Sequence, residues 1–167
     1  CSASNNIDPV YFELAASVVE AACKAGYGIV SGGTVKGCMV TVAATAAAFG
    51  VYHRGVLPRF MKGLENPALS EIQWTDTMSE RKELMRKDTC LAVALPGGVG
   101  TLDELSETFC LAKMNLYPGR VIVFNYKGFF NGFKAQLETF VETGMLGGEE
   151  LRKISFPETV EEFKELL

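Results

Sequence analysis

Short apolar runs alternate along the chain with longer segments whose apolar residues recur at helical spacing. The apolar runs predict strands at residues 28–30, 55–57, 90–95 and 121–124. The longer segments predict helices that begin near residues 9, 36, 77, 101, 129 and 160. Short strands separated by helices indicate βαβ units, in which helices cover both faces of a parallel sheet. The chain is therefore predicted to form a doubly wound α/β fold.

Local signals mark the starts of three helices. Asp8-Pro9 has the form of an N-cap followed by proline at the first helical position. Thr77-x-x-Glu80 and Thr101-x-x-Glu104 both have the form of a capping box. Residues 59–72 carry no clear periodicity and are predicted to form a loop. Every residue from 90 to 95 is apolar, which predicts a strand buried on both faces.

The 167 residues fit one domain that spans residues 1–167. With 48% apolar and 22% charged residues, the composition is that of an ordinary globular protein and excludes a disordered or collagen-like chain. The net charge of −4 argues against a nucleic-acid or membrane partner that is attracted by the whole surface. An anionic ligand must therefore bind at a local site.

The cysteine and histidine content argues against several chemistries. The chain has five cysteines, no CxxC motif and a single histidine, His53. We therefore expect no metal site, no disulfide framework and no Cys/His or Ser/His/Asp catalytic group, and we expect His53 to be structural. The sequence has no signal-peptide pattern and no apolar stretch long enough to cross a bilayer, which favours a cytoplasmic location with reduced thiols.

Two glycine-rich loops follow predicted strands, at residues 31–37 and 96–101. Backbone N–H groups in such loops converge on anions, and the dipole of the next helix favours negative charge, so both loops are candidate phosphate sites. Neither loop reads GxGxxG, and the P-loop pattern fails because Lys36 precedes Gly37. The loops therefore favour a mononucleotide or a sugar phosphate over a dinucleotide, although glycines at such turns can also be purely structural.

Three charged residues near these loops are candidates for chemistry. Glu104 follows the second loop, where it could contact a phosphorylated sugar or act only as a helix cap. Arg81 and Lys82 are predicted in the first turn of their helix, where cations oppose the helix dipole. A guanidinium directed at a substrate oxyanion explains that placement, and a solvated basic face is the alternative.

Three ordered motifs together resemble a known family. They are Ser31-Gly32-Gly33-x-x-x-Gly37-x-Met39, Met78-x-x-Arg81-Lys82 and Pro96-Gly97-Gly98-x-Gly100-Thr101-x-x-Glu104. This combination resembles the Lonely Guy family of cytokinin riboside 5′-monophosphate phosphoribohydrolases, and it covers nearly the whole chain. Members are often labelled possible lysine decarboxylases, but no lysine here lies in a recognisable pyridoxal motif.

The resemblance implies a Rossmann-like fold and hydrolysis of the N-glycosidic bond of a nucleoside 5′-monophosphate, without a cofactor or a metal, in a homodimer. It implies that Arg81 and Glu104 are catalytic. Glu65 would match a further binding glutamate, and Cys110 stands where some members have a binding threonine. The expected substrate-binding residues are Ser31, Gly32, Gly33, Glu65, Lys82, Gly97, Gly98, Val99, Gly100, Thr101, Leu102, Asp103 and Cys110.

Other interpretations remain open. The loop Cys1-Ser2-Ala3-Ser4 resembles one that follows a first strand in the family, so we expect a strand ahead of residue 1. The same fold could also belong to a nucleotide- or cofactor-binding protein that performs no chemistry. Within the enzyme class, the sequence leaves open whether the released base is a prenylated adenine, plain adenine or another base.

Overall fold

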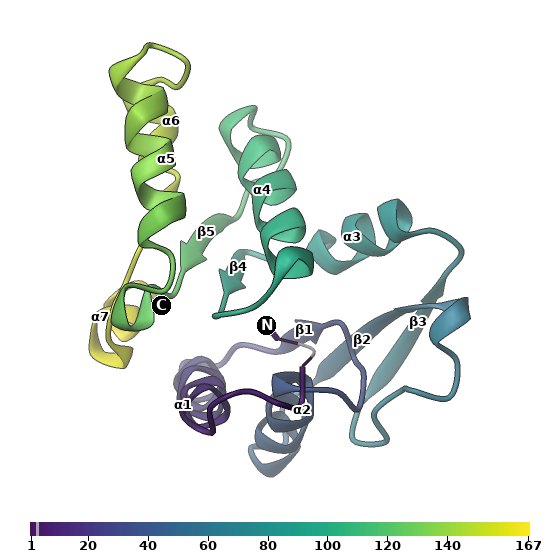
Figure 1. Ribbon diagram of the computed structural model, residues 1–167. Helices are drawn as coiled ribbons and strands as arrows, with labels where there is room; N and C mark the ends of the chain where they lie inside the picture. The colour runs from purple at the N-terminus through teal and green to yellow at the C-terminus, as the bar shows by residue number, and fades with distance from the viewer. Residues whose placement is uncertain (3) are drawn as a thin grey trace. The chain divides into compact units, whose positions relative to one another are not determined.

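The computed structural model describes residues 1–2 and 4–167, so Ala3 of the expected Cys1–Ser4 loop lies outside the described residues. The chain divides into two compact units (Figure 1). The first comprises residues 1–89 and 164–167, and the second comprises residues 90–163. No helix in these described ranges combines the length and the apolar character needed to cross a bilayer.

The first unit is built on the parallel sheet β1-β2-β3, in that spatial order. Its strands are β1 (Ile29–Ser31), β2 (His53–Pro58) and β3 (Glu71–Thr75). Its helices are α1 (Val10–Lys24), α2 (Cys38–Ala48) and α3 (Met78–Arg86), with a short 3₁₀ turn η1 (Arg59–Met61). Figure 1 shows α1 and α2 side by side, and α3 contacts β2 and β3. Buried alanines of α2, such as Ala43 and Ala46, permit the close approach of α1.

The second unit contains the parallel sheet β4-β5-β6. Its strands are β4 (Leu91–Ala94), β5 (Arg120–Val123) and β6 (Ile154–Ser155). Its helical elements are α4 (Val99–Lys113), η2 (Tyr126–Gly128), α5 (Asn131–Glu142) and α6 (Gly148–Leu151). The last helix, α7 (Val160–Glu165), begins in this unit, while residues 164–167 are grouped with the first. The predicted α/β class with parallel strands is confirmed.

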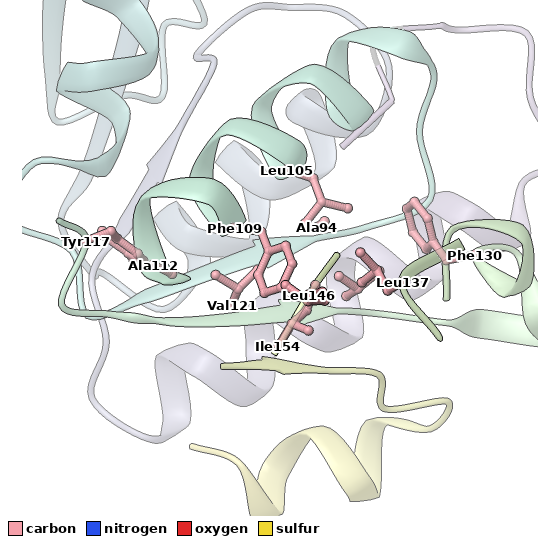
Figure 2. Close-up of a cluster of buried hydrophobic side chains, with 11 residues drawn as sticks. Ala94, Leu105, Phe109, Ala112, Tyr117, Val121, Phe130, Leu137, Leu146 and Ile154 are labelled. Atoms are coloured by element: carbon pink, nitrogen blue, oxygen red, sulfur yellow. The ribbon is translucent and has the colours of Figure 1, made fainter. Parts of the chain in front are cut away.

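The core of the second unit lies between α4 and the sheet. Figure 2 shows Leu105 and Phe109 of α4 pointing into a cluster that includes Val121, Leu137 and Leu146. These positions are 4–6% exposed, apart from Val121 at 1%. Because apolar area removed from water stabilises a fold by about 25 cal/mol per Å², this cluster holds α4 and its preceding loop on the strands.

Several predicted boundaries differ from the structure. Strand β3 was missed: residues 71–72 were assigned to the loop and residues 73–75 to no element, although the alternation of Glu71 and Gln73 with apolar residues is typical of a half-buried strand. The short elements α6 and β6 were also missed. Residues 91–93 of β4 are only half-buried, which contradicts the prediction of a strand buried on both faces. Among the described residues β4 pairs with β5 alone, so it is an edge strand.

The capping signals were correct at two helices. Pro9 has helical dihedral angles, and the Asp8 carboxylate accepts from the Val10 N–H at 3.0 Å. The Thr77 hydroxyl accepts from the Glu80 N–H at 3.1 Å, as predicted. The Glu80 carboxylate accepts instead from the N–H of Asp76, one residue before the expected partner.

Phe109→Ala should lower the free energy of unfolding by about 3–5 kcal/mol, since it leaves a cavity in the cluster of Figure 2. Denaturant titration followed by circular dichroism measures this change. Met145→Ala is the control, because Met145 is 75% exposed and its loss should change stability by less than about 0.5 kcal/mol. Equal losses in the two variants would contradict the described core.

Candidate functional site

The first glycine loop begins where β1 ends, at the carboxyl edge of the sheet of the first unit. The Ser31 hydroxyl accepts from the Gly33 N–H at 3.1 Å and lies 2.8 Å from Nε2 of His53. Gly33 has φ +67°, and a Cβ at this position would lie 2.7 Å from Cα of Gly55. Position 33 therefore requires glycine for both its backbone conformation and its contact with β2.

Arg81 is buried in this unit and lies against the same loop. It is the fourth residue of α3, and its Nε donates to the carbonyl of Val56 at 3.0 Å. A Cβ on Gly32 would lie 2.8 Å from Sδ of Met39 and closer still to Nη2 of Arg81. The structure thus brings Arg81 together with Gly32 of the first glycine loop.

Glu65 joins this group through the backbone. Thr34 and Glu65 form an antiparallel bridge, and the Asn66 N–H donates to the carbonyl of Gly33 at 2.9 Å. The Glu65 carboxylate accepts from the Gly63 N–H at 2.6 Å, which holds the side chain of this half-buried residue near its own turn. Glu65 therefore lies beside the first glycine loop. Lys82 follows Arg81 on α3 and is half-buried.

At the start of α2, which follows the first loop, two backbone N–H groups are already hydrogen-bonded to residues near the N-terminus of the chain. The Gly37 N–H donates to Oδ1 of Asn5 at 2.6 Å, and the Cys38 N–H donates to the carbonyl of Ser2 at 2.9 Å. These are the groups with which a helix N-terminus binds an anion. The expectation that this loop holds a phosphate at the start of α2 is therefore not supported.

The second glycine loop differs in this respect. Helix α4 begins at Val99, and its first intrahelical bond runs from the Leu102 N–H to the carbonyl of Gly98. Within residues 1–2 and 4–167, no hydrogen bond is formed by the N–H groups of Gly98, Val99 and Gly100. The positive end of the α4 dipole lies behind these groups, so the loop can accept an anion.

The predicted capping box Thr101-x-x-Glu104 is wrong. The N-cap is Gly98, with no side-chain cap, and Thr101 is the third helical residue with its side chain buried. Glu104 is consequently the sixth residue of α4, in the second turn. Helix capping therefore does not explain why a carboxylate stands at position 104.

Neither packing nor backbone conformation explains Gly98 and Gly100 of the second loop. A Cβ on Gly98 or Gly100 would meet no atom within 4 Å, and neither residue has a positive φ. Val99 between them is 87% exposed. An approaching ligand is a reason to keep these positions without side chains.

The remaining predicted residues of the second unit lie in this loop or on the helix that follows it. Gly97 is half-buried, and Leu102 and Asp103 are exposed on the first turns of α4. Glu104 is half-buried, and its carbonyl accepts from the Thr108 hydroxyl at 2.6 Å. Cys110 is an exposed free thiol further along α4. The predicted site residues thus form two groups, one in each unit.

Sequence reasoning missed the partner of Ser31. His53 is 1% exposed, and its pKa is lowered from 6.5 to about 4, because burial disfavours the charged imidazolium. The sequence predicted a structural His53 but not its contact with Ser31, whose Oγ lies 2.8 Å from Nε2 of the imidazole. A signal exists in the sheet register: Ser31 pairs with Gly55, and His53 lies two residues earlier on the same face of β2.

Comparison with known proteins gives consistent results. Residues 33–167 match the family described as "Possible lysine decarboxylase". A cytokinin riboside 5′-monophosphate phosphoribohydrolase of Mycobacterium tuberculosis is 32% identical over 152 residues, covering 90% of this chain and 81% of that protein. The protein of the same name from Mycobacterium marinum is 31% identical, covering 87% of this chain and 79% of that protein.

Solved structures with a similar fold are more distant in sequence. The molybdenum cofactor carrier protein from Chlamydomonas reinhardtii superposes with a TM-score of 0.74 at 16% identity, over 98% of this chain and 89% of that chain. A molybdenum cofactor binding protein from Rippkaea orientalis gives 0.69 at 18% identity, over 96% and 88%. These similarities support the fold alone.

The stability of the protein should fall as the pH decreases from about 6.5 to about 4, because the unfolded chain binds the His53 proton more readily than the folded one. The expected loss attributable to His53 is about 2 kcal/mol between pH 7 and pH 5. Urea titrations at several pH values measure it. His53→Gln should lack this component of the slope, since the chain has no other histidine, and an unchanged slope would contradict the pKa shift.

Proposed function

The chain belongs to the Lonely Guy family, matched over residues 33–167, and from this premise we propose that it hydrolyses nucleoside 5′-monophosphates. Water adds to C1′ of the ribose and the N-glycosidic bond breaks, which yields the free base and ribose 5-phosphate. The observation that carries this proposal is the buried guanidinium of Arg81 on Gly32, together with relatives that are named for this reaction. The proposed substrates are adenosine 5′-monophosphates, either AMP itself or AMP with a prenyl group on N6.

We assign the substrate phosphate to the start of α4. The unbonded N–H groups of Gly98, Val99 and Gly100 and the dipole of α4 support this assignment. Gly97, Thr101, Leu102 and Asp103 complete the proposed binding segment. The negative net charge of the protein is compatible with it, because backbone groups bind a small anion without a basic surface.

Arg81 is assigned to the departing base. Breaking the glycosidic bond leaves negative charge on the base, and a guanidinium close to it lowers the energy of that state. An arginine side chain keeps its proton in proteins, so the contribution is electrostatic and the base takes its proton from water. Burial strengthens such an interaction because the local dielectric constant is low.

Glu104 is assigned to the ribose. Its carboxylate would stabilise the positive charge that develops on the sugar ring, as carboxylates do in glycoside hydrolysis, and would orient the attacking water. The half-burial of Glu104 and its place beyond the first turn of α4 support this role, because helix capping does not account for it. Ser31, Gly32, Gly33, Glu65, Lys82 and Cys110 are the further proposed contacts with the nucleotide.

Lysine decarboxylation does not fit the residues of this chain. That chemistry uses pyridoxal phosphate held as a Schiff base by a lysine, which is activated by removal from water. None of the described lysines is buried. The half-buried ones are Lys82, Lys113 and Lys153, of which Lys113 pairs with Glu150 at 3.6 Å and Lys153 donates to the carbonyl of Ala112 at 2.9 Å.

The proposal includes a homodimer in the cytoplasm. Exposed apolar side chains on and after α2, Val40 and Phe49 at 42% each, support a contact between subunits through the alanine-rich helix. The alternative is a nucleotide- or cofactor-binding protein without activity. Arg81 and Glu104 discriminate between the two functions, because binding a phosphate requires neither residue.

Incubation of the purified protein with AMP and with N6-prenylated AMP should release the free base, which chromatography detects. Ribose 5-phosphate should appear in equal amount, because each hydrolysed bond yields one molecule of each product. The corresponding nucleosides without phosphate are the control, and they should react much more slowly. Tight binding of the nucleotides without release of base would reject the enzyme and favour the binding protein.

Arg81→Ala and Glu104→Ala should each lower kcat by at least about a hundredfold, as expected when an electrostatic contact to the transition state is removed. Steady-state kinetics measures the loss, and circular dichroism verifies the fold. Arg86→Ala and Glu107→Ala are matched controls, because they remove the same charges from half-buried positions on the same helices. Near-normal activity of Glu104→Ala would contradict the mechanism.

A further inference from the structure

In the buried pair of Ser31 and His53, some hydrogen-bonding groups have no partner among the described residues. Oγ of Ser31 lies 2.8 Å from Nε2 of His53, and it accepts from the Gly33 N–H at 3.1 Å. The other ring nitrogen, Nδ1 of His53, is buried and has no hydrogen-bond partner among the described residues. The position of the imidazole proton therefore decides what the serine can do.

The neutral imidazole of His53 has two tautomers, and they differ in the free energy of leaving Nδ1 without a partner. With the proton on Nδ1, a buried N–H donor would have no acceptor, which is rare in folded proteins. With the proton on Nε2, the imidazole donates to the serine, and Nδ1 is left only as an unused acceptor. The environment of His53 thus favours the Nε2–H tautomer.

This tautomer determines the direction of the remaining hydrogen bond. A hydroxyl has two acceptor lone pairs and one proton. In Ser31 the Gly33 N–H uses one lone pair, and the His53 Nε2–H uses the other. The hydroxyl proton then has no acceptor among the described residues. Ser31 becomes a hydrogen-bond donor only.

We propose that His53 is a positioning residue, which fixes the Ser31 hydroxyl as a donor to an oxygen atom of the nucleotide substrate. This inference rests on the proposed function. Ser31 keeps 8% of its surface exposed, whereas His53 has 1%, so the imidazole can influence a ligand only through the serine. Gly32, the next residue, lies under the guanidinium of Arg81, so the donor belongs to the same group of residues in the first unit.

The tautomer can be measured without any activity. The chain has one histidine, so ¹⁵N-labelled histidine gives the NMR signals of His53 alone. The two ring nitrogens of a neutral imidazole have well-separated ¹⁵N shifts, and long-range ¹H–¹⁵N correlation assigns the protonated one. The expected result at pH 7 is a proton on Nε2. A proton on Nδ1 would overturn the proposal, because Ser31 would then donate to His53.

Kinetics tests whether this pair acts on the substrate. Ser31→Ala should raise KM for AMP by up to about tenfold, the loss expected for one hydrogen bond, and should leave kcat within about twofold. His53→Asn and His53→Gln form a matched pair with the same amide chemistry. The longer Gln places its N–H near the position of Nε2 and should restore most of the affinity, whereas the shorter Asn should resemble Ser31→Ala.

A double-mutant cycle separates positioning from a purely structural effect. Because His53 acts through Ser31, adding His53→Asn to Ser31→Ala should raise KM by less than about twofold further. Additive effects, or equal KM values for His53→Gln and His53→Asn, would overturn the proposal. Absence of base release by the wild-type chain would reject the proposed function instead, and the NMR result would still decide the direction of the Ser31–His53 hydrogen bond.

Discussion

The packing of the Arg81 guanidinium on Gly32 is the constraint on which the first unit's group of site residues depends. The loop after β1, the strand β2 and the helix α3 meet at this point, because Nε of Arg81 also donates to the carbonyl of Val56. Burying a guanidinium costs several kcal/mol unless it is well bonded, so the loop, the strand and the helix must be in place together. A side chain at position 32 would separate them.

The two glycine loops look equivalent in sequence, yet the fold uses them differently. Asn5 and the carbonyl of Ser2 accept from the N–H groups at the start of α2, so these groups are not available to an anion. This loop instead packs against the side chain of Arg81. The start of α4 has no such internal partner among the described residues. Glycine content alone therefore identifies the place where a strand meets a helix, and the bonding of the helix end decides whether a phosphate can bind there.

The order of helices and strands was predictable because periodicity is a local property. Strand β3 was missed although the alternation of Glu71 and Gln73 with apolar residues is a local strand signal, because it covers only five residues and its first two were assigned to the preceding loop. The start of α4 was placed two residues late, because Thr101 and Glu104 have the spacing of a capping box. The contact between Ser31 and His53 depends on sheet register over 22 residues, which no local pattern encodes.

Gly98 and Gly100 also bear on how this protein could be engineered. A glycine inside a helix costs roughly 1 kcal/mol relative to alanine, and nothing in the packing requires Gly100 at the start of α4. Selection of substitutions by folding energy alone would therefore favour a replacement of Gly100, whereas Gly98 is the N-cap, where glycine is well tolerated. In the proposed function, stability and ligand access are opposed at Gly100, so a more stable variant that keeps its activity must gain its stability elsewhere.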